Sequence, residues 1–248
     1  MKWWLGNTTT GRAVGRGGIP SGPVRLTSLS WTDVADGPPP VVAVPIGSCE
    51  QHGPHLPLDT DTRIAEWLAL DAARCLDDVV VGPTLMVTAS GEHAGFPGTL
   101  SIGTAALTAV VTELVRSADW TAGVVLVNGH GGNRDAVTAA VATLRAEGRA
   151  VLDWWPCVPG GDAHAGHTET SLVLHYCPGL VDPEALAPGA MDALLELAPR
   201  LRRDGVRAVS PSGVLGDPTA ATAKHGRAVA AALVADLVTA VTAWRGRG

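Results

Sequence analysis

Three short segments of the chain concentrate carboxylate and imidazole side chains, the groups that bind metal ions in proteins. The first contains Glu50, His52 and Asp61, the second contains His130 between two glycines, and the third covers residues 162–171. Most of the eight histidines lie in these segments. Histidines without a common role would rarely gather in this way, so the pattern indicates a shared site.

Mixed carboxylate and imidazole donors are typical of zinc, manganese and iron(II) sites. Glu50 and His52 are two residues apart, so their side chains point the same way on an extended backbone. Asp61 follows eleven residues after Glu50, which leaves room for a loop to fold back. One carboxylate can bridge two cations about 3.5–4 Å apart, and water bound there has its pKa lowered to about 7. Five ligands fit such a centre: Glu50, His52, Asp61, His130 and Glu169.

Each of these residues also has a purely structural interpretation. Asp59 or Asp61 would serve equally well as the N-cap of the helix that follows. Glu169 would complement a helix dipole from a first turn, and Asn128-Gly129 is a common turn sequence. Taken one at a time, these interpretations are favoured. The coincidence of three segments favours the metal site.

The segments follow apolar runs that predict buried strands. Residues 41–46 precede the first segment and residues 123–127 precede the second. Further strands are expected at residues 79–81 and 150–155, with residues 85–88 as a continuation or another strand. Apolar spacing predicts helices at residues 26–35, 62–76, 104–116, 133–147, 168–176, 190–203 and 220–244.

Strands that alternate with helices predict an α/β fold with a largely parallel sheet covered on both faces. Such sheets build their sites in loops at the carboxyl ends of strands, where all three segments fall. The 248 residues suit one large domain, which we place at residues 26–248. Residues 1–25, rich in Gly, Thr and Arg, are expected to form a loose leader or an oligomer arm.

Composition narrows the partners and the compartment. A net charge of −6 without a basic stripe argues against nucleic-acid binding. The sequence has no signal-peptide core, and we expect no apolar segment of the roughly 18 residues that a membrane span needs. The four cysteines form no C-x-x-C pair, which favours reduced thiols and a cytoplasmic location.

At these residues the chain resembles the creatininase family of metal-dependent amidohydrolases. The matching motifs are Gly47-Ser48-Cys49-Glu50-Gln51-His52-Gly53, Asp61, Phe96-Pro97-Gly98-Thr99, Asn128-Gly129-His130 and Glu169-Thr170-Ser171. The resemblance implies a three-layer αβα fold, a two-metal site and homo-oligomers. It also implies that the five ligand candidates bind the metals, that Asp61 bridges them, and that His164 is the acid/base.

Two positions depart from the pattern of creatininase itself. Gly132 stands where that enzyme has an acidic metal ligand, and Pro159-Gly160-Gly161 stands where it has a Trp that closes the pocket. The second departure implies a more open pocket. Residues 54–61 and 91–99 most resemble the branch linked to mycofactocin biosynthesis. Its members are peptidases that release a C-terminal, Val-Tyr-derived dipeptide from a modified precursor peptide.

The leading hypothesis is therefore hydrolysis of a peptide or amide bond at a centre of two divalent cations, either zinc, iron(II) or manganese. The expected substrate is the modified precursor peptide. His164 would pass a proton to the leaving nitrogen, and His93 and His167 are candidates for substrate contact or proton transfer. Two alternatives remain. One is a small-molecule amidohydrolase that opens a cyclic amide or removes a formyl group, and the other is a non-catalytic partner protein stabilised by metal.

Overall fold

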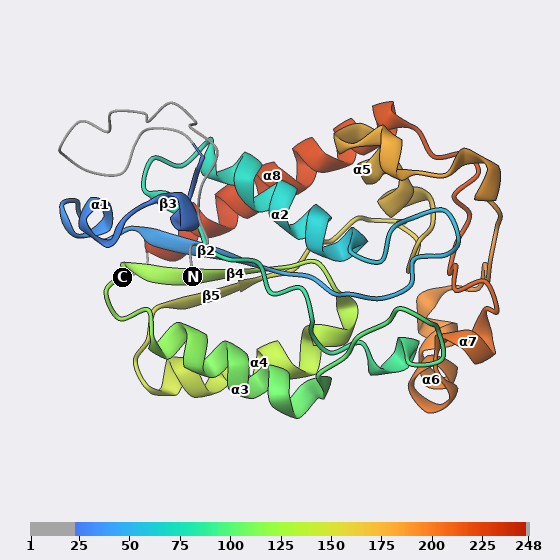
Figure 1. Cartoon of the computed structure of the whole chain (residues 1–248), viewed down its shortest axis with the longest axis horizontal. Coiled ribbons are helices and arrows are strands. Elements are labelled where there is room, and N and C mark those ends of the chain that lie inside the picture. The colour runs from blue at the N-terminus through green and yellow to red at the C-terminus, as the bar shows by residue number, and fades with distance from the viewer. Residues whose placement is uncertain (1–22, 247–248) are drawn as a thin grey trace, which may run out of the picture.

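A five-stranded parallel sheet forms the centre of the computed structural model, which describes residues 23–246 (Figure 1). The strands lie in the order β1-β3-β2-β4-β5, and each neighbouring pair is parallel. Their bounds are β1 Val24–Arg25, β2 Val41–Ile46, β3 Val79–Val81, β4 Gly123–Asn128 and β5 Val151–Trp154. The predicted α/β fold with a parallel sheet is confirmed.

Helices cover both faces of the sheet because alternate strand residues point to opposite sides. In β2, Val41 and Ala43 belong to the core beneath α2, α5 and α8, whereas Val42 and Val44 belong to the core beneath α3 and α4 (Figure 1). The covering helices are α2 Thr60–Ala73, α3 Gly103–Arg116, α4 Arg134–Ala146, α5 His167–Tyr176 and α8 Ala223–Arg245. The domain therefore has three layers.

Several element boundaries differ from those predicted. The helix expected at residues 26–35 is divided into a 3-10 turn, Leu26–Ser28, and α1, Trp31–Ala35, because the Ser30 side chain caps α1 by accepting from the Asp33 amide. Residues 85–88 form isolated bridges instead of a strand. The helix expected at residues 190–203 is α6, Leu194–Asp204, and Gly205, at φ 76°, separates it from α7, Val206–Val209.

The beginning of the chain was predicted to be a leader. Residues 1–22 of that leader lie outside the described residues. Val24 and Arg25, which we assigned to it, form β1 and pair with Val80 and Val81 of β3. The sheet therefore includes the last residues of the segment that we had separated from the domain.

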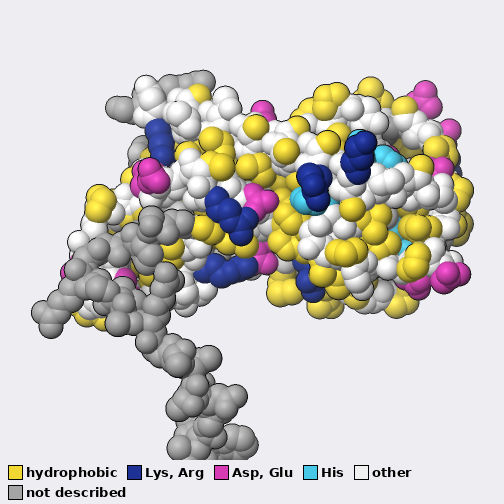
Figure 2. Space-filling view, turned by 90° about the horizontal axis from the view of Figure 1, so that it is seen from above, with side chains coloured by type: hydrophobic (Ala, Val, Ile, Leu, Met, Phe, Trp, Pro, Cys, Tyr) yellow, Lys and Arg dark blue, Asp and Glu magenta, His cyan; other side chains and the backbone are white. Residues whose placement is uncertain are grey.

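Among residues 23–246, one helix, α8, is long and apolar enough by length and composition to cross a membrane. The sequence analysis predicted no such segment, because it did not treat this Ala- and Val-rich helix as one apolar run. Leu233 and Leu237 of α8 are buried in the core that it shares with α2 and α5. Figure 2 views this side of the molecule and shows Arg and Lys side chains standing among the apolar ones. One face of α8 thus packs on the domain, as a covering helix does.

Candidate metal centre

The loops that carry the first two ligand segments start at the same edge of the sheet. Ile46, the last residue of β2, pairs with Asn128, the last residue of β4. In open parallel sheets, sites form outside the carboxyl ends of the strands where the strand order reverses. β2 lies between β3 and β4 and its helix α2 covers one face, while α3 and α4 cover the other (Figure 1). This edge is therefore the place where residues 47–61 and 129–133 can meet.

Close packing folds residues 47–61 back onto the sheet edge. Gly47 lies so near α2 that a Cβ at this position would stand 2.2 Å from the Thr62 Cα. The Thr62 hydroxyl donates to the Ser48 carbonyl oxygen at 2.7 Å, and the Ser48 amide donates to the same hydroxyl at 3.2 Å. Because Asp61 directly precedes Thr62, its carboxylate is delivered to the start of the same loop.

Asp61 lies between two groups of ligand candidates, one around His52 and the other around His130. Its Oδ1 is 2.9 Å from His52 Nε2, and its Oδ2 is 3.1 Å from His130 Nδ1. The Ser48 hydroxyl donates to Oδ2 at 2.9 Å, which holds the carboxylate in this orientation. Asp59, the other N-cap candidate, makes no cap hydrogen bond and instead pairs with Arg63. One carboxylate with an oxygen towards each imidazole has the arrangement that a bridging ligand needs.

Glu50 is completely buried, and neither of its carboxylate oxygens has a hydrogen-bond partner. His130 Nδ1 lies 3.1 Å from Glu50 Oε1, but the angles are not those of a hydrogen bond. Burying a carboxylate without a partner is costly unless it is paired or coordinates a metal. The ligand atoms of Glu50, His52 and Asp61 lie within 4.8 Å of one another. These unsatisfied oxygens fit a cation.

The histidines of the cluster share one device: the ring nitrogen that points away from the carboxylates lies against a backbone carbonyl oxygen. The pairs are His52 Nδ1 with Glu50 O at 3.1 Å, His130 Nε2 with Ala89 O at 3.1 Å, and His164 Nε2 with Gln51 O at 2.8 Å. A carbonyl only accepts, so each outward nitrogen carries the hydrogen and donates it. The inward nitrogen is then the atom that offers its lone pair to a metal or a proton, once it carries no hydrogen itself.

Glu169 completes the His52 half of the cluster from the first turn of α5. Its Oε2 lies 3.9 Å from His52 Nε2 and accepts the Ala165 amide at 2.6 Å. Ala165 is the one non-glycine residue with positive φ, 52°, among the described residues, and it is fully buried. Such backbone strain is found at functional sites when the surroundings enforce it. Here the strained turn directs an amide towards Glu169.

Gln51 links His93 and His164 to the cluster. Its side-chain nitrogen lies 2.9 Å from His93 Nδ1, 3.0 Å from His164 Nε2 and 3.1 Å from Gly213 O. Because His164 Nε2 donates its own hydrogen to Gln51 O at 2.8 Å, the two amide hydrogens go to His93 Nδ1 and Gly213 O. The His93 Nε2 hydrogen therefore faces Glu50 Oε1, at 3.4 Å. His164 presents Nδ1 to the same Glu50 oxygen at 3.9 Å. Burial lowers the pKa of His93 to about 4 and holds the pKa of His164 well below its usual value, so both rings are neutral.

The two other imidazoles have the opposite electrostatics. Burial lowers the pKa of His52, but Asp61, Glu169 and Glu50 together outweigh it and raise the value to about 10. The pKa of His130 also rises well above its usual value, because Glu50 and Asp61 outweigh burial. Burial and the Asp61 charge raise the pKa of Glu169 to about 7. The carboxylates thus favour positive charge at both imidazoles, which is the charge that a bound cation would supply.

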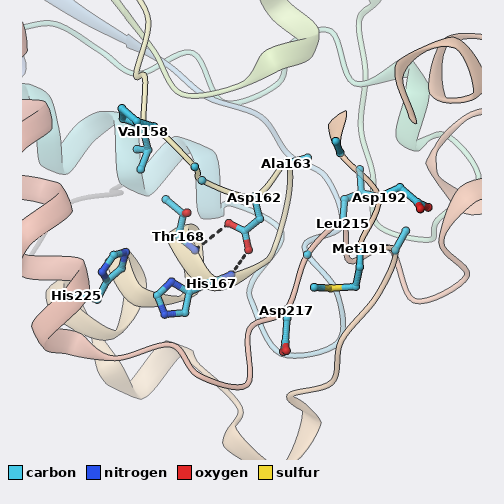
Figure 3. A pocket seen from close by; sticks show the side chains of 16 residues that line it. Val158, Asp162, Ala163, His167, Thr168, Met191, Asp192, Leu215, Asp217 and His225 are labelled. Atoms are coloured by element: carbon cyan, nitrogen blue, oxygen red, sulfur yellow. Dashed lines mark hydrogen bonds between the residues drawn. The ribbon is translucent and has the colours of Figure 1, made fainter. Parts of the chain in front are cut away.

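The structure places His167 away from the ligand cluster. Its ring lies 4.5 Å from that of His225, and its Nε2 lies 3.1 Å from Ala220 O. His167 lines a cavity of about 460 Å³ together with residues 158–163, and none of the five ligand candidates lines it. Figure 3 shows the Asp162 carboxylate beside this cavity, where it accepts the amides of His167 and Thr168.

Sequence reasoning missed the residues that hold the three loops together. The Asn133 side chain donates to Gly47 O and to Asn128 Oδ1, both at 3.0 Å, and accepts the Ala89 amide at 3.2 Å. Asn128 in turn donates to His130 O at 2.7 Å. We had given Asn128 a turn role and a place in the Asn128-Gly129-His130 motif, and Asn133 only the start of a helix. The one available signal was two asparagines flanking a histidine between glycines at a strand end.

The site has three carboxylates and two imidazoles on a parallel-sheet edge, with neutral His164 beside them. That donor set suits divalent cations of the zinc, manganese and iron(II) type. Bound there, such cations would supply the Lewis-acid chemistry of metal-dependent hydrolases, the class of enzyme that this site supports.

The comparisons with known proteins give the family. A family model described as creatininase, creatinine amidohydrolase, matches residues 27–241, so the chain belongs to the creatininase family. It is 53% identical over 213 residues to the mycofactocin precursor peptide peptidase of Mycolicibacterium smegmatis, covering 83% of this chain and 86% of that protein. It is 51% identical over 216 residues to the protein of the same name from Mycobacterium tuberculosis, with the same coverage. The predicted family and branch are confirmed.

Solved structures share the fold. A crystal structure of creatinine amidohydrolase superposes with a TM-score of 0.72 at 24% identity, covering 88% of this chain and 96% of that one. Two creatininases with the same TM-score and 24% identity are described as an Mn form and as a variant of Zn–Zn type. These matches confirm the three-layer fold.

Proposed function

We propose that this protein is a peptidase with two divalent cations that releases the C-terminal dipeptide from the modified mycofactocin precursor peptide. The main support for this proposal is the position of Asp61, whose two carboxylate oxygens face His52 and His130. Glu50 and His130 with Asp61 would hold one cation. His52 and Glu169 with Asp61 would hold the other. Zinc, iron(II) and manganese all suit this donor set.

Bound cations would polarise the scissile carbonyl and lower the pKa of the attacking water. His164 is then the group for proton transfer. Its Nε2 hydrogen is engaged by the Gln51 carbonyl, and its Nδ1 lone pair faces the cluster. Because its pKa is held well below the usual value by burial and His52, the ring begins as a base. It would take a proton from the water and return it to the leaving nitrogen.

The substrate class is supported by the names of the relatives and by the surroundings of the site. The relatives from Mycolicibacterium smegmatis and Mycobacterium tuberculosis, at 53% and 51% identity, are named as peptidases of the mycofactocin precursor peptide. Pro159-Gly160-Gly161 line the cavity beside the loop that carries His164. We propose that this cavity receives part of the peptide and that His167 contacts it there. His93, held against Glu50, would contact the substrate on the metal side.

We also propose a cytoplasmic homo-oligomer. Leu58, Met86 and Leu100 are 39%, 48% and 56% exposed, an apolar set that an interface between copies would cover. All four cysteines are free thiols, in keeping with a reducing compartment. Sedimentation velocity measures the oligomeric state, and a monomer at micromolar concentration would contradict the proposed oligomer.

Mass spectrometry of the modified precursor peptide, incubated with cation-loaded protein, tests the proposed function. The expected result is loss of the C-terminal dipeptide, and its disappearance when the cations are removed with a chelator. Intact peptide in the presence of fully loaded protein would contradict the proposal. Parallel reactions with creatinine and with a formamide substrate test the small-molecule alternatives. Turnover of either compound without cleavage of the peptide would favour those alternatives.

A further inference from the structure

Glu92 lies behind His130, on the side of the ring that faces away from Glu50 and Asp61. Its Oε1 is 3.5 Å from His130 Nε2, the nitrogen that also contacts Ala89 O at 3.1 Å. The other ring nitrogen, Nδ1, lies 3.1 Å from both Glu50 and Asp61. A carbonyl oxygen therefore accepts the Nε2 hydrogen, and a carboxylate lies beside the same nitrogen. Glu92 acts on the centre through the ring and is not itself within the ligand set.

Gly132 makes room for this carboxylate. A Cβ at position 132 would stand 2.2 Å from Glu92 Oε1, 2.4 Å from His130 Nε2 and 2.5 Å from Ala89 O. Real Cβ atoms do not approach other atoms so closely, so a side chain at position 132 would displace the Glu92 carboxylate, the His130 ring or the Ala89 carbonyl. Gly132 therefore allows the Glu92 carboxylate to lie beside the His130 ring.

The backbone that carries Glu92 is fixed by contacts that do not involve its side chain. Glu92 is the middle residue of the 3-10 turn Gly91–His93. The Ser90 amide donates to the Ser101 hydroxyl at 2.9 Å, and the Ala89 amide donates to Asn133. The Glu92 side chain is about a third exposed, at 31%. Changing its charge therefore leaves the anchors of the turn in place.

We infer that Glu92 is a positioning residue that orients His130 as a metal ligand, which rests on the metal centre in the proposed function. The Ala89 carbonyl oxygen accepts the Nε2 hydrogen, and the Glu92 carboxylate beside it further favours the tautomer in which that hydrogen stays on Nε2 and Nδ1 faces the ligand cluster. The negative charge behind the ring also makes Nδ1 a stronger donor to a cation. Carboxylate–histidine–metal arrangements of this kind typically change metal affinity by about 10–100-fold when the carboxylate is altered.

The test is cation affinity of Glu92→Gln, measured with Zn²⁺ in competition with a chromophoric chelator. Glutamine keeps the length of the side chain and removes the charge. We expect one of the two Zn²⁺ affinities to fall by about 10–100-fold, with the other unchanged. Glu113→Gln is the matched control, because Glu113 is 69% exposed and pairs with Arg116 on the surface of α3. Wild-type affinity for both Zn²⁺ ions in Glu92→Gln would overturn the inference.

A second measurement separates positioning from a general loss of structure. In the Co²⁺-loaded protein, we expect the Nε2 hydrogen of His130 to give a paramagnetically shifted, exchangeable proton signal. We expect Glu92→Gln to speed its exchange with solvent while the melting temperature of the metal-free protein stays unchanged. A weaker affinity accompanied by unfolding of the metal-free variant, with the same signal lifetime, would count against the inference.

The outcomes also separate this inference from the proposed function. If the wild type binds two Zn²⁺ and Glu92→Gln binds one of them weakly, the inference holds even where no peptide is cleaved. If both proteins bind equally and the peptide is cleaved, the inference is wrong and the function stands. If the wild type binds no Zn²⁺, both are wrong.

Discussion

Replacing Asp61 with Asn tests the centre at the residue on which both halves depend. Its two oxygens face His52 and His130 at 2.9 Å and 3.1 Å. An amide keeps the volume and one oxygen, but its NH₂ group offers no lone pair to a cation. Altering a group that hydrogen-bonds to a metal ligand typically lowers metal affinity by about 10–100-fold. We therefore expect loss of the bridging ligand itself to weaken both cations by at least about 100-fold.

The weaker cation binding of Asp61→Asn should appear as a smaller increase in melting temperature when cations are added. At a free cation concentration of about 100 Kd, each cation stabilises the fold by about 2.7 kcal/mol, and two by about 5.4 kcal/mol. In a domain of this size about 1 kcal/mol moves Tm by about 2–4 °C, so the wild-type shift is about 11–22 °C. With both affinities about 100-fold weaker, the same concentration gives about 0.4 kcal/mol per cation and a shift of about 2–3 °C.

The assay is thermal unfolding of each variant with and without Zn²⁺. Comparing loaded with metal-free protein removes any effect of the substitution on the metal-free fold. Asp59→Asn is the control, because it is the same change in the same loop, at a residue that pairs with Arg63 at 2.7 Å. It should show the wild-type shift. A wild-type shift in Asp61→Asn would refute the reasoning, and a shift halved in size would limit Asp61 to one cation.

The same geometry carries three smaller predictions. His164→Gln should lower kcat by about 10²–10⁴-fold with the cation content unchanged, as measured by kinetics and elemental analysis; an unchanged kcat would exclude His164 as the acid/base. Cation binding at pH 8 should release at least one proton, because the pKa of His52 is about 10 and Nε2 must lose its proton to bind. Affinity should then rise with pH, and calorimetry in two buffers measures the proton release; binding that does not depend on pH contradicts the assignment. Gly47→Ala should destabilise the fold by about 1–3 kcal/mol or more, because its Cβ would stand 2.2 Å from Thr62 Cα. Denaturant unfolding measures this, and wild-type stability would mean that the loop is not closely packed.

The sheet and the ligand segments were predictable because their signals are local. The runs at residues 41–46 and 123–127 are apolar on both faces, as expected for strands covered on both sides, and both are strands in the structure. Glu50 and His52 lie in one loop and Asp61 lies in the first turn of the helix that ends it, so their sequence spacing indicates that they can meet. The structure brings His130 and Glu169 to the same place from two other strand ends.

Residues whose role depends on the path of the backbone were not predictable. His164 and His167 are three residues apart, but the turn at Ala165 sends one ring to the ligand cluster and the other to the cavity. Glu92 reaches His130 from a segment with no metal-binding spacing of its own. Residues 85–88 looked like a strand because they are apolar, but Met86 is exposed and only single bridges form there.

Anomalous scattering from a crystal of the cation-loaded protein locates the metal ions themselves. We expect two peaks about 3.5–4 Å apart. One should lie beside Glu50 and His130, the other beside His52 and Glu169, and the Asp61 carboxylate should contact both. A single peak, or two peaks of which only one touches Asp61, would contradict the account.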